Sequence, residues 1–452
     1  MSREKNRVGR APLTGPPPCP LNEMGGRPET SCAPGIQNGA ENSGDSTQAK
    51  MARLLSPFLI MILAGMLSRF GYQMARSPVL PRFAQDLGAS PELLGVIVAA
   101  STVTGILIKL PAGALSDVLG RRRMMLLGCL FFAGPPFLYP LVSHPNQLLL
   151  LRFLHGFATA IFSPVASAYV VDLFEEGRGE KLGWFAAASD VGATLGPLLG
   201  GFVLFSTASY PTTYLLVGFL GLLPLAMIVL LPRETSPFQA STASDRWVKF
   251  RAGLGEVLKS PPVLISSSME AAMYVGYGAF LGFFPPYAKN IGLNDAEIGV
   301  VLGAQLATTM LAKPIAGRLS DRIGRKPMIL LGLLLCTILL PFIPHTTAFG
   351  PLFLLSALLG LGVAIVTPST TALVADLVKA GQMGSAMGVF GTIWDTGEAS
   401  GPILAGFLIA SSGYPWAFTL IAAFIGVSAV IFALTVTDPK RGKDGRRVRD
   451  QG

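Results

Sequence analysis

The stretch Gly113-Ala-Leu-Ser-Asp-Val-Leu-Gly-Arg-Arg-Arg123 returns in similar form as Gly317-Arg-Leu-Ser-Asp-Arg-Ile-Gly-Arg-Lys-Pro327. Each copy lies between two long apolar runs, and Asp117 corresponds to Asp321 at a shift of 204 positions. A glycine lets two membrane helices approach closely, and a cluster of Arg and Lys residues resists translocation across a bilayer. We therefore interpret each stretch as a very short cytoplasmic loop between two membrane-spanning helices, with an Asp near a helix end. The loop residues are Gly113, Asp117, Gly120, Arg121 and Arg122 in the first copy and Gly317, Asp321, Gly324, Arg325 and Lys326 in the second.

The composition is that of an integral membrane protein. Hydrophobic residues make up 51% of the 452 residues and charged residues only 13%, whereas an average soluble domain has roughly 25% charged residues. The four Cys and three His residues are too few and too scattered to predict a disulfide scaffold or a metal site. Because no nucleotide-binding loop or catalytic triad signature occurs, the sequence predicts neither an enzyme nor a cofactor, and it argues against direct use of ATP. The net charge of +9 comes from loops and tails, so it does not predict nucleic-acid binding.

Twelve apolar runs follow one another, each long enough for the ~20 residues of a membrane-spanning helix. A polar, basic segment at 233–261 separates an N-terminal half at 51–232 from a C-terminal half at 262–437. Residues 1–50 are predicted to be a disordered cytoplasmic tail, with Met51 as an alternative start, and 438–452 a basic cytoplasmic tail. The runs span 54–77, 91–115, 122–142, 147–171, 181–205, 211–231, 262–287, 295–316, 326–344, 349–375, 383–409 and 414–436. Within the separating segment, a short helix on the membrane surface is predicted from the spacing of Trp247, Phe250, Leu254 and Leu258.

The distribution of basic residues predicts the orientation. Of the 35 Lys and Arg residues, Arg82 and Lys289 fall on one side of the membrane and five fall inside the helices. All the others fall in the tails or in loops that follow even-numbered helices. Because loops rich in Lys and Arg stay in the cytoplasm, both termini are predicted to be cytoplasmic in a multi-pass protein of the cell membrane. The five embedded basic residues are Arg69, Arg76, Lys109, Arg152 and Lys313.

An internal repeat extends beyond the two loops. Lys109 corresponds to Lys313 at the shift of 204, and Asp190 corresponds to Asp395 at a shift of 205. Small residues spaced by four make a groove for a neighbouring helix, and proline permits bending, which suits either a rocking interface or plain tight packing. Two such halves predict pseudo-two-fold symmetry, with a substrate site between them. The hinge or packing residues are Gly192, Gly196, Pro197 and Gly200 in the fifth run, and Gly401 and Pro402 in the eleventh.

Three further motifs accompany the loops: Gly71-Tyr-Gln-Met-Ala-Arg-Ser-Pro-Val-Leu-Pro81, Arg152-Phe-Leu-His-Gly156 and Gly192-Ala-Thr-Leu-Gly-Pro-Leu-Leu-Gly-Gly201. Together they resemble the motif set of the major facilitator superfamily, and within it the twelve-helix drug:proton antiporters, over most of residues 54–437. The resemblance implies an all-α integral membrane fold of twelve transmembrane helices in two six-helix halves. It further implies a monomer that exports an amphipathic small molecule or drug in exchange for protons by alternating access, with Arg152 coupling proton movement to substrate binding.

Two other functions stay open. The first run departs from many such antiporters because it contains no Asp or Glu and carries Arg69 and Arg76 instead. This positive charge favours an importer or facilitator of an organic anion or sugar. A receptor-like protein that transports nothing is the third interpretation, and the intact, doubled loop argues against it.

Polar residues embedded in the apolar runs are the candidates for the substrate and proton site, because such residues are costly in a bilayer and are usually functional. Arg152 and His155 share a helical face, although His155 fits a satisfied core histidine equally well. Glu270, Tyr274 and Tyr277 also share a face, which suits either proton carriage or aromatic packing. Arg76 is interpreted as reaching the outer membrane surface. The candidates are Arg69, Tyr72, Gln73, Arg152, His155, Glu270, Tyr274, Tyr277, Trp394, Asp395 and Glu398.

The repeat also makes a prediction about the embedded Lys and Asp residues. In the superfamily that the chain resembles, helix 2 faces helix 11 and helix 5 faces helix 8 across the two halves. This implies two symmetry-related ion pairs, Lys109 with Asp395 and Lys313 with Asp190, which form when the cytoplasmic side is closed and break when it opens. The alternative is that each lysine extends to the cytoplasm, since it lies one turn before the loop.

Overall fold

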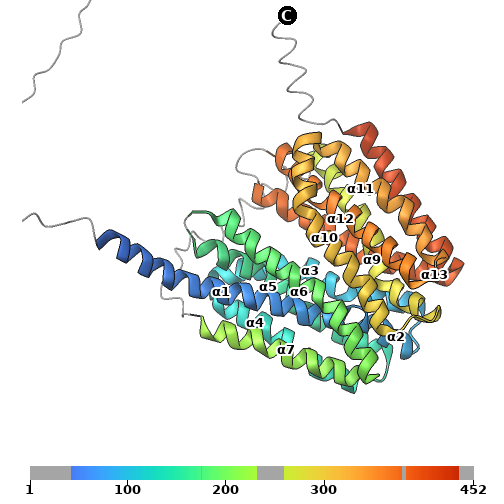
Figure 1. Ribbon diagram of the computed structural model, residues 1–452, viewed down its shortest axis with the longest axis horizontal. Helices are drawn as coiled ribbons and strands as arrows, with labels where there is room; N and C mark the ends of the chain where they lie inside the picture. Colours follow the sequence, from blue (N-terminus) through green and yellow to red (C-terminus); the bar gives the residue numbers. More distant parts are fainter. Residues whose placement is uncertain (1–41, 175, 232–258, 379–382, 437–452) are drawn as a thin grey trace, which may run out of the picture. The chain divides into compact units, whose positions relative to one another are not determined.

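The computed structural model describes residues 42–174, 176–231, 259–378 and 383–436, and every regular element in those ranges is a helix (Figure 1). Residues 1–50 and 51–452 form two separate units, of which the second contains the bundle of apolar helices. The first helix, α1, begins at Asn42, earlier than the predicted position 54. The predicted surface helix at Trp247–Leu258 and the C-terminal tail lie outside the described residues.

The N-terminal half follows the predicted order of helices. Its third element begins after Ser90, whose side chain accepts a hydrogen bond from the backbone N–H of Leu93, a common way to cap the first turn of a helix. The elements of this half are α1 (Asn42–Arg76), α2 (Val79–Asp86), α3 (Pro91–Leu119), α4 (Arg121–Ala133), η1 (Pro135–Leu141), α5 (Pro145–Asp172), α6 (Arg178–Thr207) and α7 (Tyr210–Leu230).

The C-terminal half repeats this arrangement. Its last element, α13, contains two helices that meet at Gly413, where φ is +78°, in agreement with the predicted boundary between the eleventh and twelfth runs. Ten segments of the described chain, α13 among them, are long and apolar enough to cross a membrane. Division of α13 at Gly413 and addition of the largely buried α9 give the twelve predicted helices. The elements are α9 (Pro261–Asn290), α10 (Asp295–Ile323), α11 (Arg325–Leu339), η2 (Leu340–His345), α12 (Phe349–Leu377) and α13 (Met383–Thr435).

The two signature loops are shorter than predicted. α3 continues to Leu119, so residues 113–119 are its last turns rather than loop, and Gly120 is the only residue before α4. Gly120 has a φ of +93°, which residues with a side chain rarely adopt, and the chain can therefore reverse at this point. Gly324, with a φ of +116°, separates α10 from α11 in the same way.

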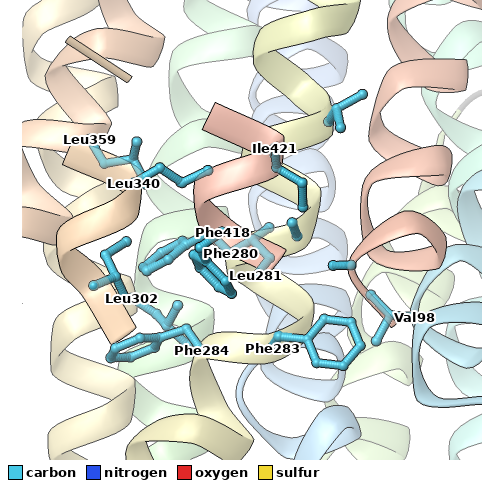
Figure 2. Packing of buried hydrophobic residues seen from close by; sticks show 14 of the residues in the cluster. Val98, Phe280, Leu281, Phe283, Phe284, Leu302, Leu340, Leu359, Phe418 and Ile421 are labelled. Carbon is cyan, nitrogen blue, oxygen red and sulfur yellow. The ribbon is translucent and has the colours of Figure 1, made fainter. Parts of the chain in front are cut away.

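The apolar core is built around α9. Phe280, Phe283 and Phe284 of this helix are fully buried, and Figure 2 shows them packed among side chains of neighbouring helices, including Val98 of α3 in the other half. Many large apolar side chains elsewhere are exposed, as expected for helices that face lipid. Because lipid tails are as apolar as the core, close packing rather than exclusion of water holds these helices together.

Candidate functional site

The structure brings together both predicted Lys–Asp pairs across the halves. The Lys109 ammonium on α3 lies 2.6 Å from one carboxylate oxygen of Asp395 on α13 and 2.8 Å from the other. On the opposite interface, between α6 and α10, the Lys313 ammonium lies 3.2 Å from a carboxylate oxygen of Asp190. The Asp395 side chain is only 6% exposed and that of Asp190 is 36% exposed, so the first pair is the more buried.

A third ion pair between the halves involves Arg76 and corrects its interpretation. Arg76 does not reach the outer surface: its Nη2 lies 2.5 Å from Oε1 of Glu398, and the two side chains are 13% and 11% exposed. The contact links α1 to α13 and joins residues 322 positions apart. In the low-dielectric interior of the membrane, a nearby carboxylate is a better partner for a guanidinium than the water and lipid head groups at the distant membrane surface. One signal for this contact was available, since Glu398 follows Asp395 by one turn and shares its helical face.

Arg152 lies in a buried polar cluster within the N-terminal half. Its side chain is 0% exposed, and its guanidinium carbon lies 4.9 Å from the centre of the Tyr72 ring. Among the described residues, no carboxylate pairs with the Arg152 guanidinium, and none of its nitrogens has an acceptor in good hydrogen-bond geometry, although the hydroxyl of Tyr139 lies close to it. His155 is also buried, and its Nδ1 lies 3.2 Å from the hydroxyl of Tyr139, a residue that no sequence motif marked. The amide oxygen of the neighbouring candidate Gln73 is likewise buried without a partner in the described chain.

The C-terminal half contributes an acid and an aromatic group. Glu270, 1% exposed on α9, accepts a hydrogen bond from the hydroxyl of Thr370 on α12. Within the described chain, no cation forms an ion pair with it. One helical turn further on, the Tyr274 ring stacks on Trp394 with centres 5.4 Å apart, and it meets Tyr277 edge-on at 5.4 Å. The role of Thr370 was missed, because threonines are common in apolar helices.

The predicted hinge glycines pack within each half. A side chain at Gly192 would collide with the carbonyl oxygen of Met66, so α6 and α1 are in backbone contact. Gly196 and Gly200 lie against the same helix. In the other half, Gly401 lies in the same way against the backbone of Val275 on α9. Pro197 and Pro402 instead face across the halves, because their carbonyl oxygens abut Gly299 and Gly95.

The two loop motifs make equivalent contacts. Arg121 lies 2.6 Å from Asp117, one turn before it, and 3.1 Å from Asp172 at the end of α5. Arg325 lies 2.6 Å from Asp321 and 3.3 Å from Asp376 at the end of α12. The second basic residue of each motif donates to backbone carbonyls: Arg122 to Ile228 and Val229, and Lys326 to Ala433. Gly113 and Gly317 lie within the last turns of α3 and α10.

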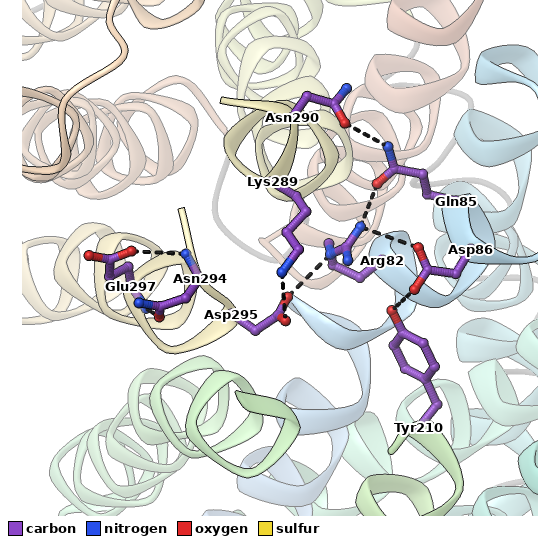
Figure 3. Close-up of polar contacts among 9 residues, drawn as sticks. All are labelled: Arg82, Gln85, Asp86, Tyr210, Lys289, Asn290, Asn294, Asp295 and Glu297. Atoms are coloured by element: carbon purple, nitrogen blue, oxygen red, sulfur yellow. Dashed lines mark hydrogen bonds and ion pairs between the residues drawn. The ribbon is translucent and has the colours of Figure 1, made fainter. Parts of the chain in front are cut away.

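A polar network that sequence analysis missed joins the halves at the other end of the helices, and we call it the far-side latch (Figure 3). The Nε of Arg82 lies 3.2 Å from Asp295, and the ammonium of Lys289 lies 3.4 Å from the same carboxylate. Gln85 donates to the side chain of Asn290 over 3.1 Å. Sequence analysis used Arg82 and Lys289 only to assign the orientation of the chain. The latch consists of Arg82, Gln85, Lys289, Asn290 and Asp295.

Two repeated halves of membrane helices, with charged and aromatic side chains meeting between them, form the architecture of a secondary transporter. The chain belongs to the Major Facilitator Superfamily, whose family model matches residues 61–287 and 267–451. It is 25% identical over 362 residues to an uncharacterised MFS-type transporter of Methanocaldococcus jannaschii, covering 80% of this chain and 93% of that one. It is 24% identical over 356 residues to multidrug resistance protein 2 of Bacillus subtilis, covering 77% of this chain and 88% of that protein. Among solved structures, a mutant of the nucleoside transporter NupG has a similar fold, with a TM-score of 0.70 at 14% identity over 84% of this chain and 100% of that chain.

Proposed function

We propose that this protein is a proton-coupled secondary transporter that exports an amphipathic small molecule by alternating access. It works as a monomer in the cell membrane, with both termini and the two loop motifs on the cytoplasmic side. The distribution of Lys and Arg residues supports the orientation. The glycine motif of α6 and the similarity to a multidrug resistance protein support export.

The observation that carries proton coupling is the position of Glu270. This acid is buried between α9 and α12, and among the described residues it has a hydroxyl partner but no cation. An embedded carboxyl group that no cation neutralises can bind and release a proton as its surroundings change. The inter-half pair of Arg76 and Glu398 also lies in this interior, so a proton and a cargo molecule can affect the same contacts between the halves.

We expect the Glu270→Gln variant to lose concentrative transport, because glutamine keeps the shape of the side chain but cannot exchange a proton. A substrate panel in proteoliposomes with an imposed pH gradient measures this effect directly. The variant should still equilibrate cargo down its own gradient. Glu180→Gln, the same change at a largely exposed acid, is the control and should transport normally. Concentrative transport that persists after an uncoupler has collapsed the proton gradient would contradict proton coupling.

We expect Asp117→Asn to shift the protein toward the inward-facing state, because the substitution weakens the contact with Arg121 that stabilises the closed cytoplasmic side. Charge contacts of this kind are worth about 0.3–1 kcal/mol, so the expected change in population is roughly two- to fivefold. The accessibility of single cysteines placed at the cytoplasmic ends of the helices measures it. Asp321→Asn, at the more exposed equivalent position, should have a smaller effect, and unchanged accessibility in Asp117→Asn would disprove the gating role.

A second candidate function is transport of an organic anion in either direction. Arg69 and Arg152 favour it, since neither forms an ion pair of its own in the described chain and the carboxylate on which Arg69 acts, that of Glu398, is paired with Arg76. Flux assays that load the cargo on either side of the same proteoliposomes would separate import from export.

A further inference from the structure

We infer that the cargo of this transporter carries an anionic group, such as a carboxylate, which Arg69 and Arg152 receive on the N-terminal half. The inference rests on the proposed transport function, but it concerns the cargo and not the coupling ion or the direction. It begins from the charged residues embedded in the described helices, because some of the cations form ion pairs and others do not.

Three of the five embedded basic residues have a carboxylate partner in the other half. Arg76 pairs with Glu398, Lys109 with Asp395, and Lys313 with Asp190. The remaining acid, Glu270, is held by the Thr370 hydroxyl. Within the described chain, Arg69 and Arg152 are therefore the embedded cations without an ion pair of their own. The charge of Arg69 acts on the Glu398 carboxylate, but that carboxylate is already paired with Arg76.

Of these two cations, Arg152 is the more deeply buried and has the greater need for an acceptor or a negative charge. A guanidinium has five N–H donors, and a buried donor without an acceptor is destabilising, more so when the group is charged. Arg152 is fully buried, and in the described chain no carboxylate pairs with it. Its neighbours there are the Tyr72 ring, the neutral hydroxyl of Tyr139 and the imidazole of His155. None of these groups supplies a negative charge, so the cluster is incomplete without an anion.

Arg69 is more accessible than Arg152. It is half-buried on α1, one turn before Tyr72 and on the same helical face. The Tyr72 ring contacts the Arg152 guanidinium, whereas the charge of Arg69 acts on Tyr277 and Glu398 of the other half. Arg69 is thus placed to meet an incoming anion between the halves, while Arg152 adds positive potential from within the N-terminal half.

The facing half offers an apolar surface. The contact between Arg76 and Glu398 shows that α1 faces α13, the helix that carries Trp394. The Trp394 ring is half-buried and stacks on Tyr274. An amphipathic cargo could place its anionic group against α1 and its apolar body against this aromatic pair. A cationic cargo would find Glu398, Asp395 and Asp190 already paired with Arg76, Lys109 and Lys313, and Glu270, which has no cation among the described residues, is only 1% exposed.

The test is an equilibrium binding measurement on the full chain in nanodiscs, without a pH gradient. The probes are matched ligands with one ring body and three head groups: an aromatic carboxylate, its amide and the corresponding methylammonium, over several ring sizes. We expect the carboxylates to bind at least about tenfold more tightly than the amides, as a charge-assisted hydrogen bond implies. Arg69→Gln should remove this margin, Arg69→Lys should keep most of it, and Arg318→Gln, at an exposed position of α10, should leave it unchanged.

Two results would overturn the proposal. The first is that no ring series shows a preference for the carboxylate, which includes the case of no binding at all. The second is a carboxylate preference that persists in both Arg69→Gln and Arg152→Gln. Proton-driven flux is measured separately. Failure of proton coupling would leave an anion preference intact, and failure of the anion preference would leave pH-driven transport of a neutral or cationic cargo measurable.

Discussion

Transport that is lost in Lys109→Asp and in Asp395→Lys is expected to return in part when the two substitutions are combined. Each single change places two like charges at a contact that now joins an ammonium and a carboxylate 2.6 Å apart. Disruption of a buried ion pair costs about 3–5 kcal/mol, and the partial exposure of Lys109 lowers the expected cost to about 1–3 kcal/mol. A cost of that size corresponds to a loss of roughly five- to 150-fold in transport rate. The double variant restores opposite charges across the same interface.

The measurement is initial flux in proteoliposomes at matched protein density. The corresponding exchange of Lys313 and Asp190 is the internal comparison, and smaller losses are expected there because that pair is more exposed. If the double variant at positions 109 and 395 is no more active than the worse single variant, the contact has no role in transport. Reaction of a cysteine at position 109 with a cytoplasmic reagent in every state would instead indicate that Lys109 extends to the cytoplasm.

The second large effect is expected at Arg76 and Glu398. Arg76→Met should abolish transport and lower the thermal stability of the purified protein, because it leaves the Glu398 carboxylate almost buried and unpaired. Glu398→Gln should be milder for stability, since the amide can still accept a hydrogen bond from Arg76. The double variant Arg76→Met with Glu398→Met removes both charges. It should be at least about 1 kcal/mol more stable than the sum of the two single Met substitutions predicts.

Thermal unfolding in detergent, together with flux, completes this double-mutant cycle. Strictly additive effects on stability would show that the two side chains do not interact. Restored stability without restored transport would show that the pair is needed for the transport cycle and not only for assembly.

The fold was predictable from the lengths of the apolar runs and the loop motifs, and part of the site was predictable from the internal repeat. The repeat places Lys109 and Lys313 at equivalent points, and the arrangement of helices in the superfamily indicates which Asp residue each one faces. Arg76 has no equivalent basic residue in the second half, where position 280 is a phenylalanine, so its partner could not be inferred by symmetry. A basic residue near a helix end also has two acceptable environments, the membrane surface and a buried carboxylate.

The far-side latch was unpredictable for a different reason. Its members come from the last turn of α2, the last turn of α9 and the start of α10, where polar residues are expected in any membrane protein. Their meeting depends on how closely the two halves approach at that end. Backbone contacts such as those of Gly95 with Pro402 and Gly201 with Gly299 determine that distance, and the sequence does not indicate which glycines contact the other half.

The glycine contacts within each half limit how many parts of this molecule can move independently. At Gly192, Gly196 and Gly200 there is no side chain between α6 and α1, and the same holds at Gly401 between α13 and α9. Helices whose backbones are in contact along several turns are packed too closely to slide or tilt relative to each other. We therefore expect α1 to move together with α6, and α9 together with α13, as two rigid pairs of helices. If each pair of helices moves as a rigid body, a small displacement at the Arg76–Glu398 contact implies a larger displacement at the distant ends of the same helices.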